Sequence, residues 1–175
     1  MENTNKKVLH IFDLDETVIS SSHRTPYFPN GDLNLNLYRE KQTHENIMKD
    51  KLLPLAEVMK EFIDDGCEVA IITARRMTKS DYVMLRKNAI KTAYIGSRDR
   101  IHKVEHISNC LKKHFFSTDS EYKRVWFKDI KEKFPLSEYE IYMYDDNKSV
   151  LKVALEEGFH AIDSIQLNKI ITGAV

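Results

Sequence analysis

The fold of this chain is decided by the stretch Val8-Leu9-His10-Ile11-Phe12-Asp13-Leu14-Asp15-Glu16-Thr17. Its first half is mostly apolar, which is typical of a strand buried on both faces of a sheet. Asp13 and Asp15 follow where that strand ends, and an open α/β sheet binds its ligands beyond the carboxyl ends of its strands. Two such carboxylates repel each other unless a cation or a proton offsets their charge. Asp13 and Asp15 therefore indicate a divalent metal site, an acid/base pair, or both.

Apolar strands alternate with amphipathic helices along the rest of the chain. We expect further strands at 68–73, 92–95, 140–144 and 159–162. Helices are expected after Thr43, from Pro54 to Gly66, from Thr78 to about Asn88, from Thr118 to Pro135 and from Asn147 to Gly158. Alternating strands and helices indicate a parallel sheet with right-handed crossovers. The predicted fold is α/β, with three layers, a Rossmann-like and mainly parallel sheet, and one domain over residues 1–175.

The segment 18–50 is predicted to be a small flap inserted into that domain. The dipeptide Asn30-Gly31 is a strong hairpin-turn signal. Beyond it, Leu33, Leu35 and Leu37 alternate with polar residues, as in a half-buried strand. The flap would act as a minimal cap over the end of the first strand.

Composition limits the possible classes of protein. Lys plus Arg equals Asp plus Glu at 27 each, which argues against a dedicated nucleic-acid coat. A local basic segment from Arg98 to Lys113 is still a candidate for following a nucleic-acid backbone. Cys67 and Cys110 are too few for a disulfide framework and fit a reducing compartment. The polar N-terminus and the lack of an apolar run of about 20 residues predict a cytoplasmic protein without membrane contact.

Polar groups also follow two later strands. Thr73 ends the strand at 68–73, and Asp145-Asp146 end the strand at 140–144. If these strands are parallel neighbours of the first, all these groups meet in one crevice. Several carboxylates with water form a hard oxygen site suited to Mg²⁺. Such a site holds a phosphate, with Thr73 donating to a free oxygen and a lysine neutralising charge in the transition state.

Four motifs in this order resemble the haloacid dehalogenase superfamily. They are a strand ending in Asp-x-Asp-x-Thr, a strand ending in Thr, a lysine near a helix start and a strand ending in Asp-Asp. The resemblance extends from about Val8 to Ile162. It implies a Mg²⁺-dependent phosphatase, because the dehalogenases of the superfamily do not need the second aspartate, Asp15, as an acid/base.

The resemblance also implies roles for single residues. Asp13 would be the nucleophile that forms an aspartyl-phosphate. Asp15 would protonate the leaving oxygen and then deprotonate the attacking water. Thr73 and Lys123 would bind the transferring phosphoryl group, and Arg75 would contact the substrate.

The implied metal ligands are carboxylates from two motifs. Mg²⁺ would be held by Asp13, Asp15, Asp145 and Asp146. Lys103 and Lys112 compete with Lys123 for the role of active-site lysine. We favour Lys123 because it opens a well-capped helix just before the last acidic strand.

Neither interval between motifs leaves room for a full cap domain, so the site would be open to a large substrate. The small cap, Arg75 and the Lys-x₃-Phe/Trp helix are similar to the 3′-phosphatase domain of phage polynucleotide kinase-phosphatases. We therefore expect a phosphomonoesterase for nucleotide or polynucleotide 3′ ends. A protein phosphatase, suggested by Asp-Leu-Asp-Glu-Thr, a small-molecule or 5′-nucleotide phosphatase, and an inactive scaffold stay open as alternatives.

Overall fold

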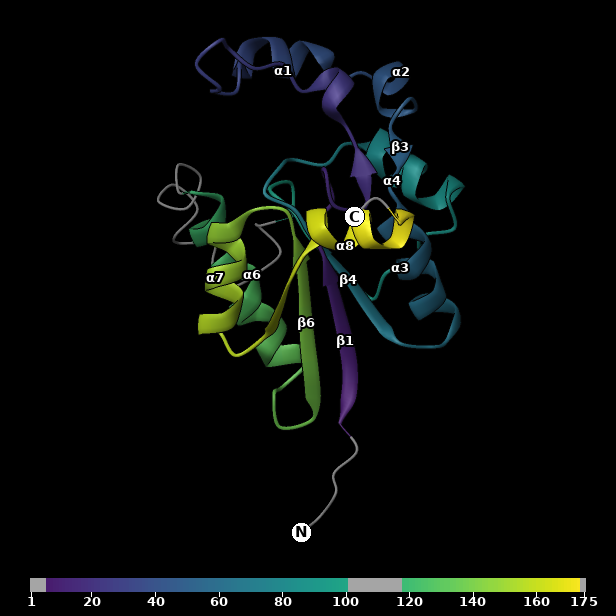
Figure 1. Cartoon of the computed structure of the whole chain (residues 1–175), viewed down its shortest axis with the longest axis vertical. Coiled ribbons are helices and arrows are strands. Elements are labelled where there is room, and N and C mark those ends of the chain that lie inside the picture. The colour runs from purple at the N-terminus through teal and green to yellow at the C-terminus, as the bar shows by residue number, and fades with distance from the viewer. Residues whose placement is uncertain (1–5, 101–117, 174–175) are drawn as a thin grey trace.

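The computed structural model of the chain describes residues 6–100 and 118–173. Its centre is a five-stranded parallel sheet with the strand order β5-β4-β1-β6-β7 (Figure 1). The strands are β1 (Lys7–Phe12), β4 (Glu68–Ile72), β5 (Tyr94–Gly96), β6 (Tyr139–Asp145) and β7 (His160–Asp163). The predicted parallel α/β sheet is confirmed, and each predicted strand lies within two residues of an observed one.

Helices cover both faces of the sheet, which gives the three predicted layers (Figure 1). On one face lie α6 (Asp119–Lys133) and α7 (Lys148–Glu156). On the other lie α3 (Pro54–Asp64), α4 (Lys79–Lys87) and α8 (Ser164–Thr172). Pattern analysis did not predict α8, a short C-terminal helix capped by Asp163.

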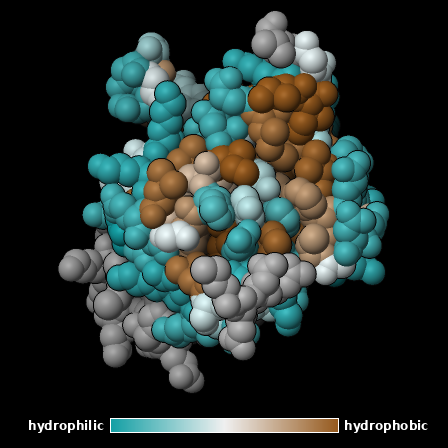
Figure 2. Space-filling model, turned by 60° about the horizontal axis from the view of Figure 1, so that its bottom comes forward, coloured by the Kyte–Doolittle hydropathy of each residue, from teal (hydrophilic) through white to brown (hydrophobic). Residues whose placement is uncertain are grey.

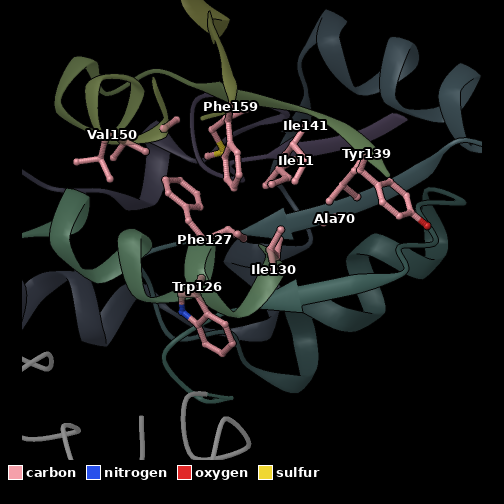
Figure 3. Close-up of a cluster of buried hydrophobic side chains, with 14 of the residues drawn as sticks. Ile11, Ala70, Trp126, Phe127, Ile130, Tyr139, Ile141, Val150 and Phe159 are labelled. Carbon is pink, nitrogen blue, oxygen red and sulfur yellow. The ribbon is translucent and has the colours of Figure 1, made fainter. Parts of the chain in front are cut away.

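The alternation of side chains along the strands divides the core into two clusters. Leu9 and Ile11 point toward α6 and α7, whereas Phe12 belongs to the cluster under α3 and α4. Figure 3 shows the first cluster, in which Trp126 and Phe127 of α6 pack beneath the sheet. A methyl group on Gly96 would lie 2.7 Å from the Trp126 ring, so this strand end approaches α6 too closely for any larger residue.

The insertion differs from the prediction between residues 33 and 37. A helix, α1 (Leu35–Lys41), replaces the predicted strand because the Asn34 side chain accepts a hydrogen bond from Leu37 N and so caps a helix. Leu35 and Leu37 are 55% and 38% exposed, so their spacing does not mark a buried sheet face. The turn at Asn30-Gly31 is confirmed, since Gly31 has φ +88° and Tyr27 bridges Leu33 across it.

Short elements close the base of the insertion. Strands β2 (Ile19–Ser20) and β3 (Lys51–Leu52) pair antiparallel, and between them lie η1 (Ser22–Arg24), α1 and α2 (His44–Ile47). Thr43 caps α2, as predicted. The insertion therefore leaves and re-enters the domain through one hydrogen-bonded pair of strands, beyond the carboxyl end of β1 (Figure 1).

On the face drawn in Figure 2, the hydrophobic residues lie in separate areas. Among the described residues, the most exposed large apolar side chains come from the insertion, from α7 and from α8: Tyr27, Phe28, Leu35, Leu155 and Ile170. No helix within the described residues has the length and apolar character needed to cross a membrane. Lys103, Lys112 and most of the basic segment lie outside those residues, so their predicted roles stay predictions.

His10 is a buried titratable group in the core. Its ring stacks on Phe62 with centroids 3.8 Å apart, and its Nδ1 lies 3.0 Å from the Tyr144 hydroxyl. Burial lowers the pKa of His10 from 6.5 to about 4. Because the unfolded chain binds this proton more readily, stability is complete above the unfolded pKa and is lost as the pH falls toward 4.

We predict that His10→Asn flattens the acid dependence of stability. Wild type should lose roughly 2 to 3 kcal/mol through His10 between about pH 7.5 and about pH 4.5, and the variant should lose that much less. Urea unfolding at both pH values measures the difference. Ser149→Ala, a substitution of an exposed residue without a titratable side chain, is the control and should keep the slope. Equal slopes for wild type and His10→Asn would contradict the prediction.

Candidate active site

Three neighbouring strand ends bring the predicted site residues to one edge of the sheet. Asp13 follows β1, Thr73 follows β4, and Asp145 ends β6. The hydrogen bonds between neighbouring strands continue one residue beyond β1 and β4. Asp13 N donates to Tyr144 O and Thr73 N donates to Gly96 O, each at 2.9 Å. β1 pairs with both β4 and β6, so this edge is the point where the strand order reverses.

Three acids form a compact group at this edge. One carboxylate oxygen from each of Asp13, Asp145 and Asp146 lies within 4.8 Å of the others. Asp13 and Asp145 are buried, at 5% and 0% exposure. Asp145 is held in place because its Oδ1 accepts a hydrogen bond of 2.9 Å from Asn147 N. Hard oxygen donors at this spacing suit Mg²⁺.

Lys123 lies between two of these acids. Its Nζ donates to Asp13 Oδ1 at 2.5 Å and to Asp145 Oδ2 at 2.7 Å. The lysine stands in the second turn of α6, which Thr118 caps by accepting a hydrogen bond from Glu121 N. The structure thus brings the preferred lysine of the sequence analysis into contact with both acidic motifs.

The electrostatics of the group show an excess of negative charge. Burial raises the pKa of Asp13 well above its usual range, against the effect of Lys123 and with the help of Asp145. Burial and the charge of Asp145 raise the pKa of Asp146 to about 6. Burial would lower the pKa of Lys123, but Asp13 and Asp145 raise it overall. Three carboxylates with one ammonium leave two negative charges, which a divalent cation would neutralise.

The carboxylate of Asp15 has a different environment. Arg75 Nε lies 2.9 Å from Asp15 Oδ2, and Arg24 Nη2 lies 3.7 Å from Oδ1. The side chain is 28% exposed and is not part of the three-acid group among the described residues. The structure therefore brings together three of the four predicted metal ligands and holds the fourth beside two guanidinium groups.

The turn that separates the two acids depends on Glu16. Glu16 has φ +56°, in the left-handed region that non-glycine residues seldom adopt. Its Oε1 accepts a hydrogen bond of 2.9 Å from Ser21 N, and its own N–H donates to Ile19 O. These bonds stabilise the turn without the backbone freedom of glycine.

Arg75 is fixed by partners on α4. Its Nη2 donates to Asp81 Oδ1 at 2.6 Å, and Asp81 Oδ2 accepts hydrogen bonds from the N–H and hydroxyl of Thr78 in the predicted capping box. Thr73 is buried, and its Oγ1 accepts from Arg75 N at 3.4 Å. The predicted substrate contact of Arg75 is untested, while its contact with Asp15 is direct.

Sequence patterns missed three residues of the insertion. Arg24 is fully buried and forms a two-pronged ion pair with Asp50, through Nε–Oδ1 at 2.7 Å and Nη2–Oδ2 at 2.6 Å. Gln42 Oε1 accepts from the guanidinium groups of Arg24 and Arg75. An arginine in a polar run resembles a surface residue, and only the folded insertion brings these partners together.

Solved structures with the same arrangement of elements define the fold. A haloacid dehalogenase-like family hydrolase from Streptococcus pneumoniae matches with a TM-score of 0.60 and 16% identity, over 90% of this chain and 84% of that chain. A second hydrolase, from Streptococcus pneumoniae TIGR4, matches with a TM-score of 0.55 and 12% identity, over 95% of this chain and 99% of that chain. The fold is that of haloacid dehalogenase-like hydrolases, as predicted.

Sequence comparison gives the family. The family model described as bacteriophage T5 5′-deoxynucleotidase matches residues 1–175. The 5′-deoxynucleotidase of Escherichia phage T5 is 37% identical over 171 residues, which cover 93% of this chain and 69% of that protein. The chain belongs to the bacteriophage T5 5′-deoxynucleotidase family. The narrower resemblance to polynucleotide kinase-phosphatases is not shown by these relatives and stays a prediction.

We predict that Lys123→Met destabilises the fold by about 3 to 5 kcal/mol, because it leaves two buried carboxylates without their cation. Urea unfolding in the presence of a chelator measures the loss. Adding Asp13→Asn to Lys123→Met should restore part of it by removing one unpaired charge. Lys128→Met, an exposed position on the same helix, is the control. A loss below about 1 kcal/mol for Lys123→Met would contradict the role of the buried ion pairs.

Proposed function

We propose that this chain is a Mg²⁺-dependent phosphomonoesterase that hydrolyses 5′-deoxynucleoside monophosphates through an aspartyl-phosphate on Asp13. The observation that carries the proposal is the contact of Lys123 with Asp13 and Asp145 at the sheet's switch point. Membership of a family named for a 5′-deoxynucleotidase supports the nucleotide as substrate. Two cysteines, too few for a disulfide framework, support a cytoplasmic location.

The first chemical step uses the carboxylate of Asp13. One of its oxygens attacks phosphorus, and the bond between phosphorus and the 5′ oxygen of the nucleoside breaks. The Lys123 ammonium stays beside Asp13 and balances charge on the phosphoryl oxygens, while the Thr73 hydroxyl donates to one of them. The product of this step is an aspartyl-phosphate and a nucleoside alkoxide that needs a proton.

Asp15 supplies and recovers that proton. Protonated Asp15 donates to the leaving 5′ oxygen, and its carboxylate then removes a proton from the water that attacks phosphorus. The second attack breaks the bond between phosphorus and the Asp13 oxygen and releases inorganic phosphate. The contacts with Arg75 and Arg24 hold the Asp15 carboxylate away from Lys123, so the two acids serve different purposes.

The cation fits the group formed by Asp13, Asp145 and Asp146. These carboxylates would hold Mg²⁺, which supplies positive charge to the phosphoryl oxygens and lowers the repulsion between phosphate and Asp13. Asp15, predicted as a fourth ligand, is assigned to acid/base work instead because its carboxylate pairs with Arg75. Asp146 completes the oxygen set and borders the solvent side of the group.

We predict that phosphate release from p-nitrophenyl phosphate requires Mg²⁺ and is lost with chelator. Asp13→Asn should lower kcat by about a thousandfold or more, since it removes the nucleophile. Asp64→Asn, an exposed acid on α3, should keep wild-type activity. Metal-independent turnover, or full activity of Asp13→Asn, would refute the mechanism, and an inert wild type would favour the scaffold alternative.

Asp15→Asn gives a separate prediction. It should slow hydrolysis of a 5′-deoxynucleotide by about a hundredfold or more, because the sugar alkoxide needs a proton. It should slow p-nitrophenyl phosphate much less, because p-nitrophenolate is a stable leaving group. Comparing the two substrates measures the effect. An equal loss on both would show that Asp15 acts in some other way than as the acid.

The position of the phosphate is the next prediction. We expect kcat/KM for 5′-deoxynucleoside monophosphates to exceed that for 3′-phosphorylated oligonucleotides, 3′-nucleotides and phosphopeptides by about tenfold or more, a difference of about 1.4 kcal/mol. A malachite green assay on this panel measures it. Faster turnover of 3′-phosphorylated oligonucleotides would restore the polynucleotide 3′-phosphatase interpretation, and faster turnover of phosphopeptides the protein phosphatase one.

A further inference from the structure

We propose that the exposed ring of Tyr27 stacks on the nucleobase of the substrate. Tyr27 belongs to the insertion, whose Arg24 contacts the Asp15 carboxylate. This inference rests on the proposed function and names a base-binding site within it. The insertion would recognise the nucleoside while Asp13 reacts with the phosphate. The occupant is the flat heterocycle of a mononucleotide.

The exposure of the ring is the first observation. Tyr27 is 62% exposed and the next residue, Phe28, is 48% exposed. In the described part of the chain, the Tyr27 ring has no stacking partner and its hydroxyl forms no hydrogen bond. Aromatic side chains dominate the energetics of binding surfaces because they bury a large area, and tyrosine adds a polar end.

The loop that carries the ring is held in one shape. Phe28 N donates to Asp32 O at 2.8 Å, and Asn34 N donates to Pro26 O at 3.0 Å. The Asn30 side chain donates to the Asp32 carboxylate at 2.7 Å. Binding therefore loses little conformational entropy in this loop, which is the requirement of a preorganised site.

The insertion places Tyr27 near the reacting groups. Arg24, three residues earlier, is buried against Asp50 and lies 3.7 Å from Asp15 Oδ1. Three residues span at most about 11 Å. Besides partial burial, the charges of Glu16, Asp146 and Asp15 raise the pKa of Tyr27. The carboxylate of Asp15 is thus common to the contact of Arg24 and to the electrostatic surroundings of Tyr27.

The distance and chemistry fit a nucleotide. With the phosphate beside Asp13 and Lys123, the base would extend outward past the exposed side of the site, toward the insertion. Aromatic rings stack on any nucleobase, because every base has a π face. A single stacking residue therefore favours nucleotides over sugar phosphates without selecting one base.

Phe28 provides a matched control on the same loop. Tyr27 takes part in an antiparallel bridge with Leu33, so its backbone is extended. Successive side chains of extended backbone point to opposite sides. We therefore expect Phe28, an exposed aromatic residue of similar size, to point away from the side on which Tyr27 lies.

The test compares Tyr27→Ala, Tyr27→Phe and Phe28→Ala on two substrates. One is a 5′-deoxynucleoside monophosphate and the other is 2-deoxyribose 5-phosphate, which lacks the base. Tyr27→Ala should lower the ratio of kcat/KM for nucleotide over sugar phosphate by about tenfold to a hundredfold, mainly through KM. Tyr27→Phe, which keeps the ring, and Phe28→Ala should keep the wild-type ratio.

The outcomes separate this inference from the proposed function. A wild type that hydrolyses neither substrate refutes both. A wild type that hydrolyses the nucleotide, with an unchanged ratio in Tyr27→Ala, refutes the base site alone. If Phe28→Ala lowers the ratio of kcat/KM as much as Tyr27→Ala does, the effect belongs to the loop as a whole, and the assignment of the base site to Tyr27 is overturned. Circular dichroism of each variant verifies that the fold is intact.

Discussion

The excess of negative charge at the carboxyl end of β1 is the constraint on which the rest of the structure depends. Asp13, Asp145 and Asp146 have carboxylate oxygens within 4.8 Å of one another, and Lys123 of α6 contacts Asp13 and Asp145. Bringing carboxylates out of water costs free energy unless opposite charge is close. The fold meets this cost by pairing β1 with β6 and by placing a capped helix so that its lysine reaches both acids.

A second consequence concerns Asp15, only two residues from Asp13. The left-handed turn at Glu16 and two guanidinium groups give Asp15 an environment unlike that of Asp13. Two carboxylates in different surroundings can take different chemical roles, as one nucleophile and one proton carrier require. The sequence motif places the two acids two residues apart. Their different surroundings come from Arg75, in the loop after β4, and from Arg24, in the insertion, which both contact Asp15.

Much of the fold and of the site was predictable, for physical reasons that the residues themselves show. Buried strands such as Val8–Phe12 are mostly apolar, and helices such as α6 carry cap residues that signal their start. The alternation at Leu33, Leu35 and Leu37 predicted a strand, and this prediction was wrong. Asn34 caps a helix in which Leu35 and Leu37 are exposed to solvent. The Arg24–Asp50 pair has no local signal, since its partners are 26 residues apart and meet only after folding.

The insertion is joined to the carboxyl edge of the sheet by buried polar bonds as well as by buried apolar side chains such as Ile19 and Ile47. Arg24 pairs with Asp50, and Gln42 accepts from both arginines that face Asp15. A buried hydrogen-bonded network admits few alternative arrangements, because each shift leaves a charge unpaired. Such an insertion does not need to close over the substrate in order to contribute to recognition. Arg24 contacts both Asp50 and Asp15, so under the proposed function a small cap can place an aromatic ring where it contributes to the selection of the substrate.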